Sequence, residues 1–345
     1  MAKDITIVAG PDSAESERQT YEMGYKIGFI GKIAKRYGIN FKFRSGAWKP
    51  RTEYWEKGGN GDRKKVFHGV GEIGLEWMKE IAERYDLPIV SEAMSEMDIR
   101  HFNRHLEPER DYIQIGARTS QAFALLYEVG GTSFGVLLKN PQHGVSPKEV
   151  IGSSERFLKT REWVYCIRGQ TKYIHPDGEN TPEHSAYLDN LLSSQHQHQD
   201  ARNLNNIKTI NALRKRPDFD GITLCHDPSH VWGGKTHETR RKIGEYAVKA
   251  FTEFDYDWII IEVNDRSANS PCDREQALAT TLNGIDWSQT YVGAEPPDDQ
   301  KPLSLVDIVE QVMLDRVVKG QAVIQQQQLE LDLQQLHALR WDITP

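Results

Sequence analysis

Eight short apolar runs recur along this chain of 345 residues, and they constrain its fold more than any other feature. They lie at residues 5–9, 41–44, 88–93, 112–117, 134–139, 163–169, 221–227 and 258–264. Most are continuously apolar rather than alternating, so they predict strands that are covered on both faces. Segments with helical periodicity separate them, such as residues 74–85 and 238–254.

Eight repeats of strand and helix predict an α/β fold, a closed (β/α)8 TIM barrel, with an open doubly wound sheet as the alternative. We expect the barrel domain to span residues 1–295. Two helical segments, at 303–320 and 321–341, predict a C-terminal helical extension within residues 296–345. The extension packs either on the barrel or against another subunit. The polar stretch 175–210 predicts a solvated loop.

Composition argues against several classes of protein. The net charge is -7, so there is no overall basic field to hold a nucleic acid. Three cysteines without a CxxC pair are typical of a reducing compartment. The chain shows no signal-peptide pattern and no apolar run near the ~20 residues of a membrane helix. We therefore expect a cytoplasmic protein that binds neither nucleic acid nor membrane.

Charged residues stand at the ends of the predicted strands, where a barrel carries its active site. Four of them are basic and come from different strands: Lys49, Arg118, Lys139 and Arg168. Clustered cations repel one another unless an anion is present, so they indicate a phosphorylated or carboxylated ligand. The alternative is that each pairs with a nearby carboxylate, such as Glu92 or Asp227.

A second set of strand-end residues combines one imidazole with three carboxylates: Asp12, His230, Glu262 and Asp273. Hard oxygen ligands with one His suit Mn, Fe, Co or Zn in a site that polarises a carbonyl group. From the residues alone, a merely hydrogen-bonded histidine is the alternative.

The strings AGPDSAES, RSGAWKPRT, GLEWMKEI, LPIVSEAM, QIGAR and DPSH follow one another along the chain. In this order the chain resembles the 3-deoxy-D-arabino-heptulosonate 7-phosphate (DAHP) synthases, of the branch related to 3-deoxy-D-manno-octulosonate 8-phosphate synthases. The resemblance covers roughly residues 5 to 280. It implies a TIM-barrel transferase, a homodimer or homotetramer, that condenses phosphoenolpyruvate with an aldose phosphate and uses a divalent metal. The string Lys49-Pro50-Arg51-Thr52 favours erythrose 4-phosphate as acceptor, which is the shikimate-pathway reaction.

The resemblance also implies residue roles. Phosphoenolpyruvate would be held by Lys49, Arg118, Lys139 and Arg168, and the sugar phosphate by Arg51 and Thr52. Lys49 would donate a proton to the nascent alkoxide, and Asp227 would support substrate binding. His230, a further catalytic residue, matches a metal ligand together with Glu262 and Asp273.

The chain departs from the family pattern at Asp12, where a Cys ligand is usual. A carboxylate there would shift preference toward harder ions such as Mn or Mg. We expect an altered metal site, because three carboxylates without a cation would repel. The alternative is that Asp12 only caps a turn and the site holds no metal.

Further departures lie on the aldose side, at Asn140-Pro141, Ile167 and Thr171. They leave two alternatives open. One is a synthase with another acceptor, octulosonate-like or from secondary metabolism. The other is a catalytically silent barrel that binds phosphoenolpyruvate.

Overall fold

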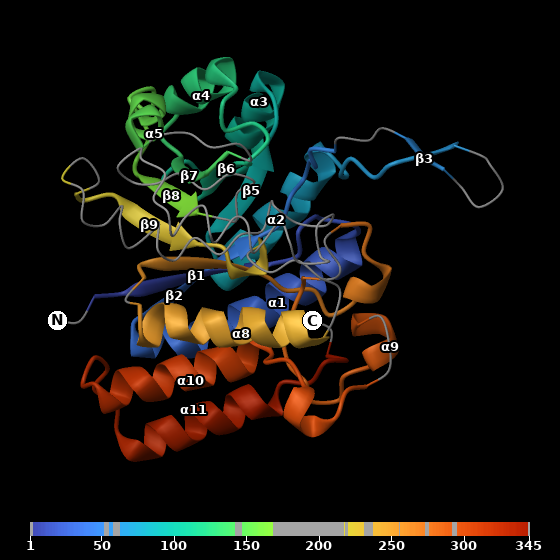
Figure 1. Ribbon diagram of the computed structural model, residues 1–345, viewed down its shortest axis with the longest axis vertical. Helices are drawn as coiled ribbons and strands as arrows, with labels where there is room; N and C mark the ends of the chain where they lie inside the picture. The colour runs from blue at the N-terminus through green and yellow to red at the C-terminus, as the bar shows by residue number, and fades with distance from the viewer. Residues whose placement is uncertain are drawn as a thin grey trace, which may run out of the picture.

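Eight parallel strands close into a barrel in the order β1-β10-β9-β8-β7-β6-β5-β2 (Figure 1). The computed structural model describes residues 3–51, 55–57, 63–141, 147–167, 217, 220–230, 237–254, 256–272, 276–291 and 295–343. The barrel strands are β1 (Ile5–Gly10), β2 (Ile39–Arg44), β5 (Ile89–Ala93), β6 (Tyr112–Ile115), β7 (Gly135–Lys139), β8 (Trp163–Ile167), β9 (Thr223–His226) and β10 (Trp258–Glu262). Each predicted run forms one of these strands. The predicted TIM barrel is therefore confirmed, and the open sheet is excluded.

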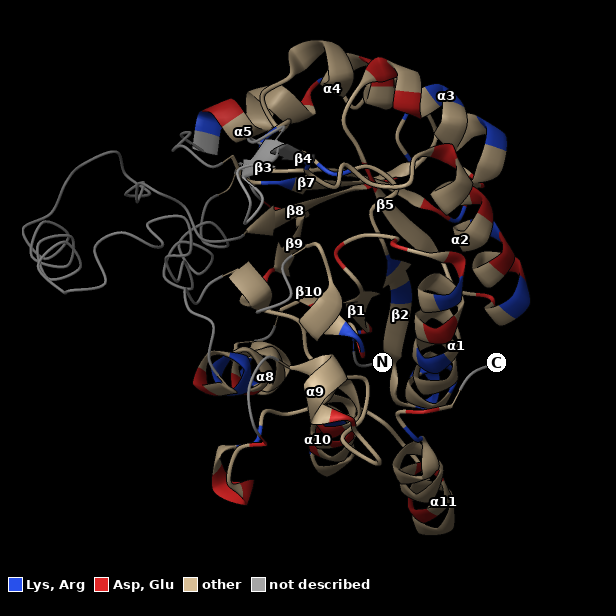
Figure 2. Ribbon diagram, turned by 90° about the vertical axis from the view of Figure 1, so that its right-hand side faces the viewer, with Lys and Arg blue, Asp and Glu red and all other residues tan. Residues whose placement is uncertain are grey.

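Helices surround the barrel (Figures 1 and 2). Among the described residues, the α-helices are α1 (Glu17–Ala34), α2 (Glu72–Tyr85), α3 (Glu96–His105), α4 (Phe123–Gly130), α5 (Pro147–Ser154), α8 (His237–Thr252), α9 (Trp287–Thr290), α10 (Leu305–Val318) and α11 (Gln326–Ala338). Local sequence sets where they begin: the Ser16 hydroxyl accepts a hydrogen bond from the amide of Gln19 at the start of α1. The predicted helical segments 74–85 and 238–254 form α2 and α8.

The strands are buried on both faces, which explains their continuously apolar sequences. In β1, Val8 belongs to the apolar cluster inside the barrel, whereas Ile7 belongs to the layer between strands and helices. Ile260 and Ile259 divide in the same way in β10, which pairs with β1 in parallel register. The period of two that places side chains on alternate faces thus supplies two cores from one strand.

The two C-terminal helices pack back on the barrel. Helix α10 contacts α8 and α1, and α11 contacts α10 and α1 (Figure 1). Because α10 contacts both α8 and α1, the C-terminal segment contributes a helix to the outer ring, and the domain boundary at residue 295 stays a prediction. Outside the ring, β3 (Trp55–Lys57) and β4 (Arg63–Lys65) form a hairpin that projects from the body.

A buried network fastens the C-terminal segment to the residues just after β10. The Lys26 ammonium on α1 lies 2.7 Å from the Asp265 carboxylate and also donates to the backbone carbonyl of Trp341. The Trp341 indole in turn donates to the backbone carbonyl of Asp265 at 3.0 Å. Asp265 also accepts from the amide of Thr280 at 2.7 Å. The chain that follows Glu262 is therefore held by α1 and by the C-terminal segment together.

Two further predictions concern a solvated loop and the lack of a membrane helix. The polar stretch 175–210 lies outside the described residues. Within the described part of the chain, no helix is long and apolar enough to cross a membrane.

Candidate active site

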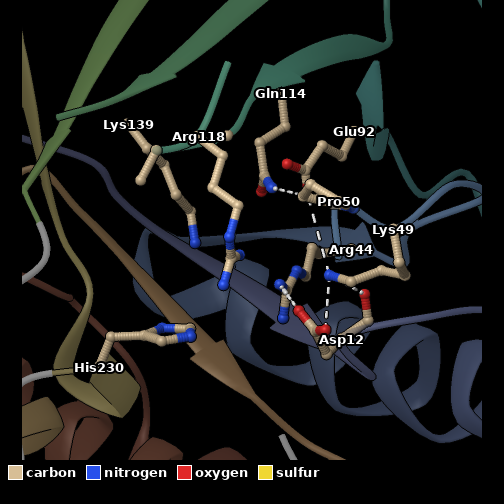
Figure 3. Close-up of a pocket in the computed structure, with 11 residues that line it drawn as sticks. Asp12, Arg44, Lys49, Pro50, Glu92, Gln114, Arg118, Lys139 and His230 are labelled. Atoms are coloured by element: carbon tan, nitrogen blue, oxygen red, sulfur yellow. Dashed lines mark hydrogen bonds and ion pairs between the residues drawn. The ribbon is translucent and has the colours of Figure 1, made fainter. Parts of the chain in front are cut away.

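A pocket opens at the carboxyl ends of the strands, the end of a barrel where active sites form (Figure 3). It is open to solvent on one side, and the space between its walls is narrow. Its lining residues are Asp12, Arg44, Lys49, Pro50, Glu92, Gln114, Gly116, Ala117, Arg118, Lys139 and His230. Polar and charged side chains therefore dominate a site built from strands far apart in sequence.

The structure brings most of the predicted site residues together. Lys49, Arg118, Lys139, Asp12 and His230 line the pocket, and Asp227 and Glu262 contact lining residues directly. The predictions for Thr52, Arg168 and Asp273 fall outside the described residues.

Arg51 makes contacts with its own chain beside the pocket. Its guanidinium donates to the backbone carbonyls of Phe67 at 3.3 Å and Pro271 at 2.9 Å, and to the Cys272 sulfur. These bonds tie the loop after β2 to the segment after β10.

On one side of the pocket, four residues form a buried chain of contacts. Lys139 at the end of β7 places its Nζ 2.9 Å from Asp227 Oδ2, just beyond β9. Both Asp227 oxygens lie 2.9 Å from Nδ1 of His230, and His230 Nε2 lies 3.4 Å from Glu262 Oε1. The backbone amide of Glu262 donates to the Ser229 hydroxyl at 3.0 Å. Asp227 thus orients the imidazole and leaves Nε2 facing Glu262.

On the other side, Arg44 connects two acidic residues. At the end of β2, its Nη1 lies 3.2 Å from Glu262 Oε1 and its Nη2 bonds Asp12 Oδ1. Lys49 Nζ lies 2.5 Å from Asp12 Oδ2 and 3.7 Å from Glu92, which accepts from the Gln114 amide at 3.2 Å. Burial alone would raise the pKa of Asp12, but Lys49 and Arg44 hold that pKa well below its usual range.

Sequence reasoning missed Arg44. It is the last residue of an apolar run, so it reads as part of the strand rather than as a group beyond the strand end. The signal that could have found Arg44 is the alternation of residues in the strand, because Lys42 and Arg44 are two positions apart in β2 and therefore share a face. In the structure this face points into the barrel, since Lys42 contacts the inward-facing rings of Tyr112 and Trp258. Arg44 therefore points toward the barrel axis at the carboxyl end of β2, where the pocket lies.

Two of the four predicted basic residues pair with carboxylates, which is the alternative to an anion site that the sequence left open. Lys49 contacts Glu92, and Lys139 contacts Asp227. Cations and carboxylates alternate around the mouth, so each lysine is already stabilised by an acidic neighbour.

A model of the DAHP synthetase I family matches residues 2–291. The chain belongs to the DAHP synthetase I family. The resemblance seen in the sequence is therefore confirmed. A phospho-2-dehydro-3-deoxyheptonate aldolase of Thermotoga maritima is 28% identical over 275 residues, which are 79% of this chain and 65% of that protein. The chain thus spans somewhat less than two thirds of this relative.

Solved structures agree with the family assignment. The crystal structure of the Thermotoga maritima phospho-2-dehydro-3-deoxyheptonate aldolase (DAHP synthase) aligns with a TM-score of 0.57 at 26% identity, covering 80% of this chain and 65% of that one. A truncated form of the Thermotoga maritima synthase aligns with a TM-score of 0.55 at 24% identity, covering 80% of each chain. The second likeness supports the fold.

Two glycines allow this family member to pack its charged groups so closely. Gly10 ends β1 with φ +147°, and a Cβ there would lie 2.1 Å from the Arg44 carbonyl oxygen. A Cβ on Gly116 would lie 1.8 Å from the Glu92 carboxylate. The backbones of β1 and β2 therefore approach closely only because residue 10 has no side chain.

Three of the four expected metal ligands lie in the described residues, and cationic side chains of the chain itself contact the carboxylates among them, whereas Asp273 lies outside the described residues. Both Asp12 oxygens contact cationic side chains, and Glu262 shares Arg44 with Asp12. Over the residues that the structure describes, no group of three His, Cys, Asp or Glu side chains could hold a metal ion. The expectation assumed three carboxylates without a cation, and Arg44 and Lys49 remove that premise.

Proposed function

We propose that the chain condenses phosphoenolpyruvate with an aldose phosphate, with erythrose 4-phosphate as the first candidate acceptor, to give DAHP and phosphate. The observation that carries this proposal is the single pocket of a family member in which Arg44, Lys49, Arg118 and Lys139 converge. A phosphate and a carboxylate on one small ligand match such a set of cations. We further propose a cytoplasmic homodimer or homotetramer.

In this proposal, different side chains of the pocket bind phosphoenolpyruvate and donate the proton. Lys139 and Arg118 point into the pocket on the side of His230, and Lys49 lies beside Asp12 (Figure 3). We assign the anionic groups of phosphoenolpyruvate to Lys139 and Arg118, with Arg168 as a further predicted contact. Lys49 then faces the aldehyde, where its ammonium donates a proton to the oxygen as C3 of the enol bonds the aldehyde carbon.

His230 serves the second half of the reaction in this proposal. Water adds at C2, and phosphate leaves with cleavage of its bond to carbon. The imidazole Nδ1 is held by Asp227 at 2.9 Å, so Nε2 is the nitrogen that can exchange a proton in the pocket. Asp227 is a positioning residue for this step.

An acceptor other than erythrose 4-phosphate is the second candidate, and Arg51 is the observation that favours it. Its guanidinium already donates to Phe67, Pro271 and Cys272, although the resemblance assigns it to the sugar phosphate. A shorter or differently charged acceptor would not need that contact.

Phosphate release from phosphoenolpyruvate tests the proposal when measured with a panel of aldoses and aldose phosphates. We expect turnover with erythrose 4-phosphate and its loss in Arg118→Met, with the surface variant Lys79→Met as a control. Turnover confined to another sugar would select the second candidate. Binding of phosphoenolpyruvate with no turnover for any acceptor would refute the enzyme and leave the silent barrel.

A further inference from the structure

Two buried carboxylates at the pocket require positive charge: Asp12 lines the pocket, and Glu262 contacts the lining residues Arg44 and His230. Asp12 is 6% exposed and Glu262 is 2% exposed, and they come from opposite ends of the matched sequence. An unpaired carboxylate in such surroundings would cost several kcal/mol or take up a proton. Whatever supplies the charge between these two residues therefore sets the electrostatics of the site.

Arg44 supplies that charge from within the chain. Its guanidinium is 3% exposed and uses different nitrogens for the two carboxylates, Nη1 for Glu262 and Nη2 for Asp12. The planar fork of an arginine suits this bridging role, since it presents several donors in fixed directions. The close approach of β1 to β2 at Gly10 holds the Arg44 backbone against the strand that leads to Asp12.

A carboxylate at position 12 does something here that a thiolate could not do. One Asp12 oxygen bonds Arg44, and the other lies 2.5 Å from Lys49 Nζ. A cysteine has a single ligating atom, whereas aspartate can give each cation its own oxygen. The residue that departs from the family pattern is thus the one that completes this internal ion cluster.

A divalent ion bound to Asp12 and Glu262 would need oxygen contacts of about 2.0–2.6 Å. An ion that used Asp12 Oδ1 and Glu262 Oε1 would have to enter the space that the Arg44 guanidinium occupies, and an ion that used Asp12 Oδ2 would lie beside the ammonium of Lys49. Three positive groups in a buried pocket would repel one another strongly. We infer that Arg44 takes the place of a divalent metal ion between Asp12 and Glu262, so that this chain works without a metal ion at that centre.

The catalytic part of this inference rests on the proposed function, but the binding part does not. Metal binding can therefore be measured on the full chain whether or not any substrate turns over. The variants to compare are Asp12→Ala, His230→Ala and Arg44→Met, with Arg104→Met as a control arginine on the surface of α3.

The first experiment titrates Mn²⁺ and Zn²⁺ into chelator-treated protein and counts ions per chain after dialysis. We expect the wild type and Arg104→Met to hold no stoichiometric ion that depends on Asp12 or His230. Removal of the internal cation in Arg44→Met exposes two carboxylates to solvent ions, so its Mn²⁺ affinity should rise at least about tenfold. Circular dichroism confirms that each variant is folded.

The results that would overturn the inference differ from those that would support it. One ion per chain that is lost in Asp12→Ala or in His230→Ala would overturn the inference. An ion retained in both variants lies elsewhere and leaves the inference standing. Where phosphate release is detected, an excess of chelator should leave its rate unchanged, and a chelator-induced loss that Mn²⁺ restores would also overturn it. Failure to find any turnover counts only against the proposed function.

Discussion

The buried pair between Lys26 and Asp265 gives a sharp stability prediction. The two side chains are 1% and 4% exposed, and their charged atoms are 2.7 Å apart. Replacing Lys26 by Met keeps most of the apolar stem but leaves the Asp265 carboxylate buried without its ammonium partner. Loss of one partner from a buried pair costs about 3–5 kcal/mol.

Lys26 also donates to the Trp341 carbonyl, and a lost hydrogen bond adds about 1 kcal/mol. We therefore expect Lys26→Met to lower the free energy of unfolding by about 5 kcal/mol. Urea denaturation followed by circular dichroism and tryptophan fluorescence measures this change. Asp265→Asn, which keeps an acceptor for Thr280, should cost less stability in the Lys26→Met background than alone, because in that background it removes a buried carboxylate that has already lost its ammonium partner.

The matched control is Lys79→Met. Lys79 lies 3.9 Å from Glu83, and both side chains are about half exposed, so this change should cost under about 0.5 kcal/mol. A Lys26→Met protein within about 1 kcal/mol of the wild type would refute the argument that this pair fastens the C-terminal segment to the barrel.

Three further predictions follow from individual residues. Burial lowers the pKa of His226 from 6.5 to about 4, so the folded state binds fewer protons and unfolding free energy is lost as pH falls through that window. The share of this loss that His226 causes should reach about 3 kcal/mol, so His226→Phe should lose about that much less than the wild type in urea titrations at neutral and acidic pH; an equal loss in both proteins would contradict it. Gly10→Ala forces a Cβ to within 2.1 Å of the Arg44 carbonyl, so it should cost more than about 2 kcal/mol by thermal denaturation. Lys139→Met should weaken phosphoenolpyruvate binding at least about tenfold by calorimetry, and an unchanged dissociation constant would remove Lys139 from the ligand site.

The barrel could be predicted from the sequence because its signal is local. A strand covered on both faces must be apolar at every position, and eight such runs separated by helices leave few alternatives. The gathering of Lys49, Arg118, Lys139 and His230 follows from topology alone, because parallel strands end at one rim. That part of the site needed no knowledge of side-chain contacts.

The ion pairs of the site could not be predicted, because they depend on distances between strands, and the sequence does not give these distances. Whether Lys49 pairs with Glu92 is decided by the register of β2 against β5 and by the loop after β2. The role of Arg44 depends on its inward orientation. Likewise, the Pro- and Asp-rich segment before α10 indicates a boundary in sequence, although α10 packs within the outer ring of helices.

The alternation of charge around the mouth has a consequence for ligand binding. Among the residues that the structure describes there, Arg44, Lys49, Arg118 and Lys139 face four carboxylates, those of Asp12, Glu92, Asp227 and Glu262. The described part of the mouth is therefore close to electrical neutrality, and a multiply charged anion gives it excess negative charge. We expect such a ligand to bring protons with it, so its binding enthalpy should vary with the ionisation enthalpy of the buffer, and its affinity should weaken as the solution becomes more alkaline.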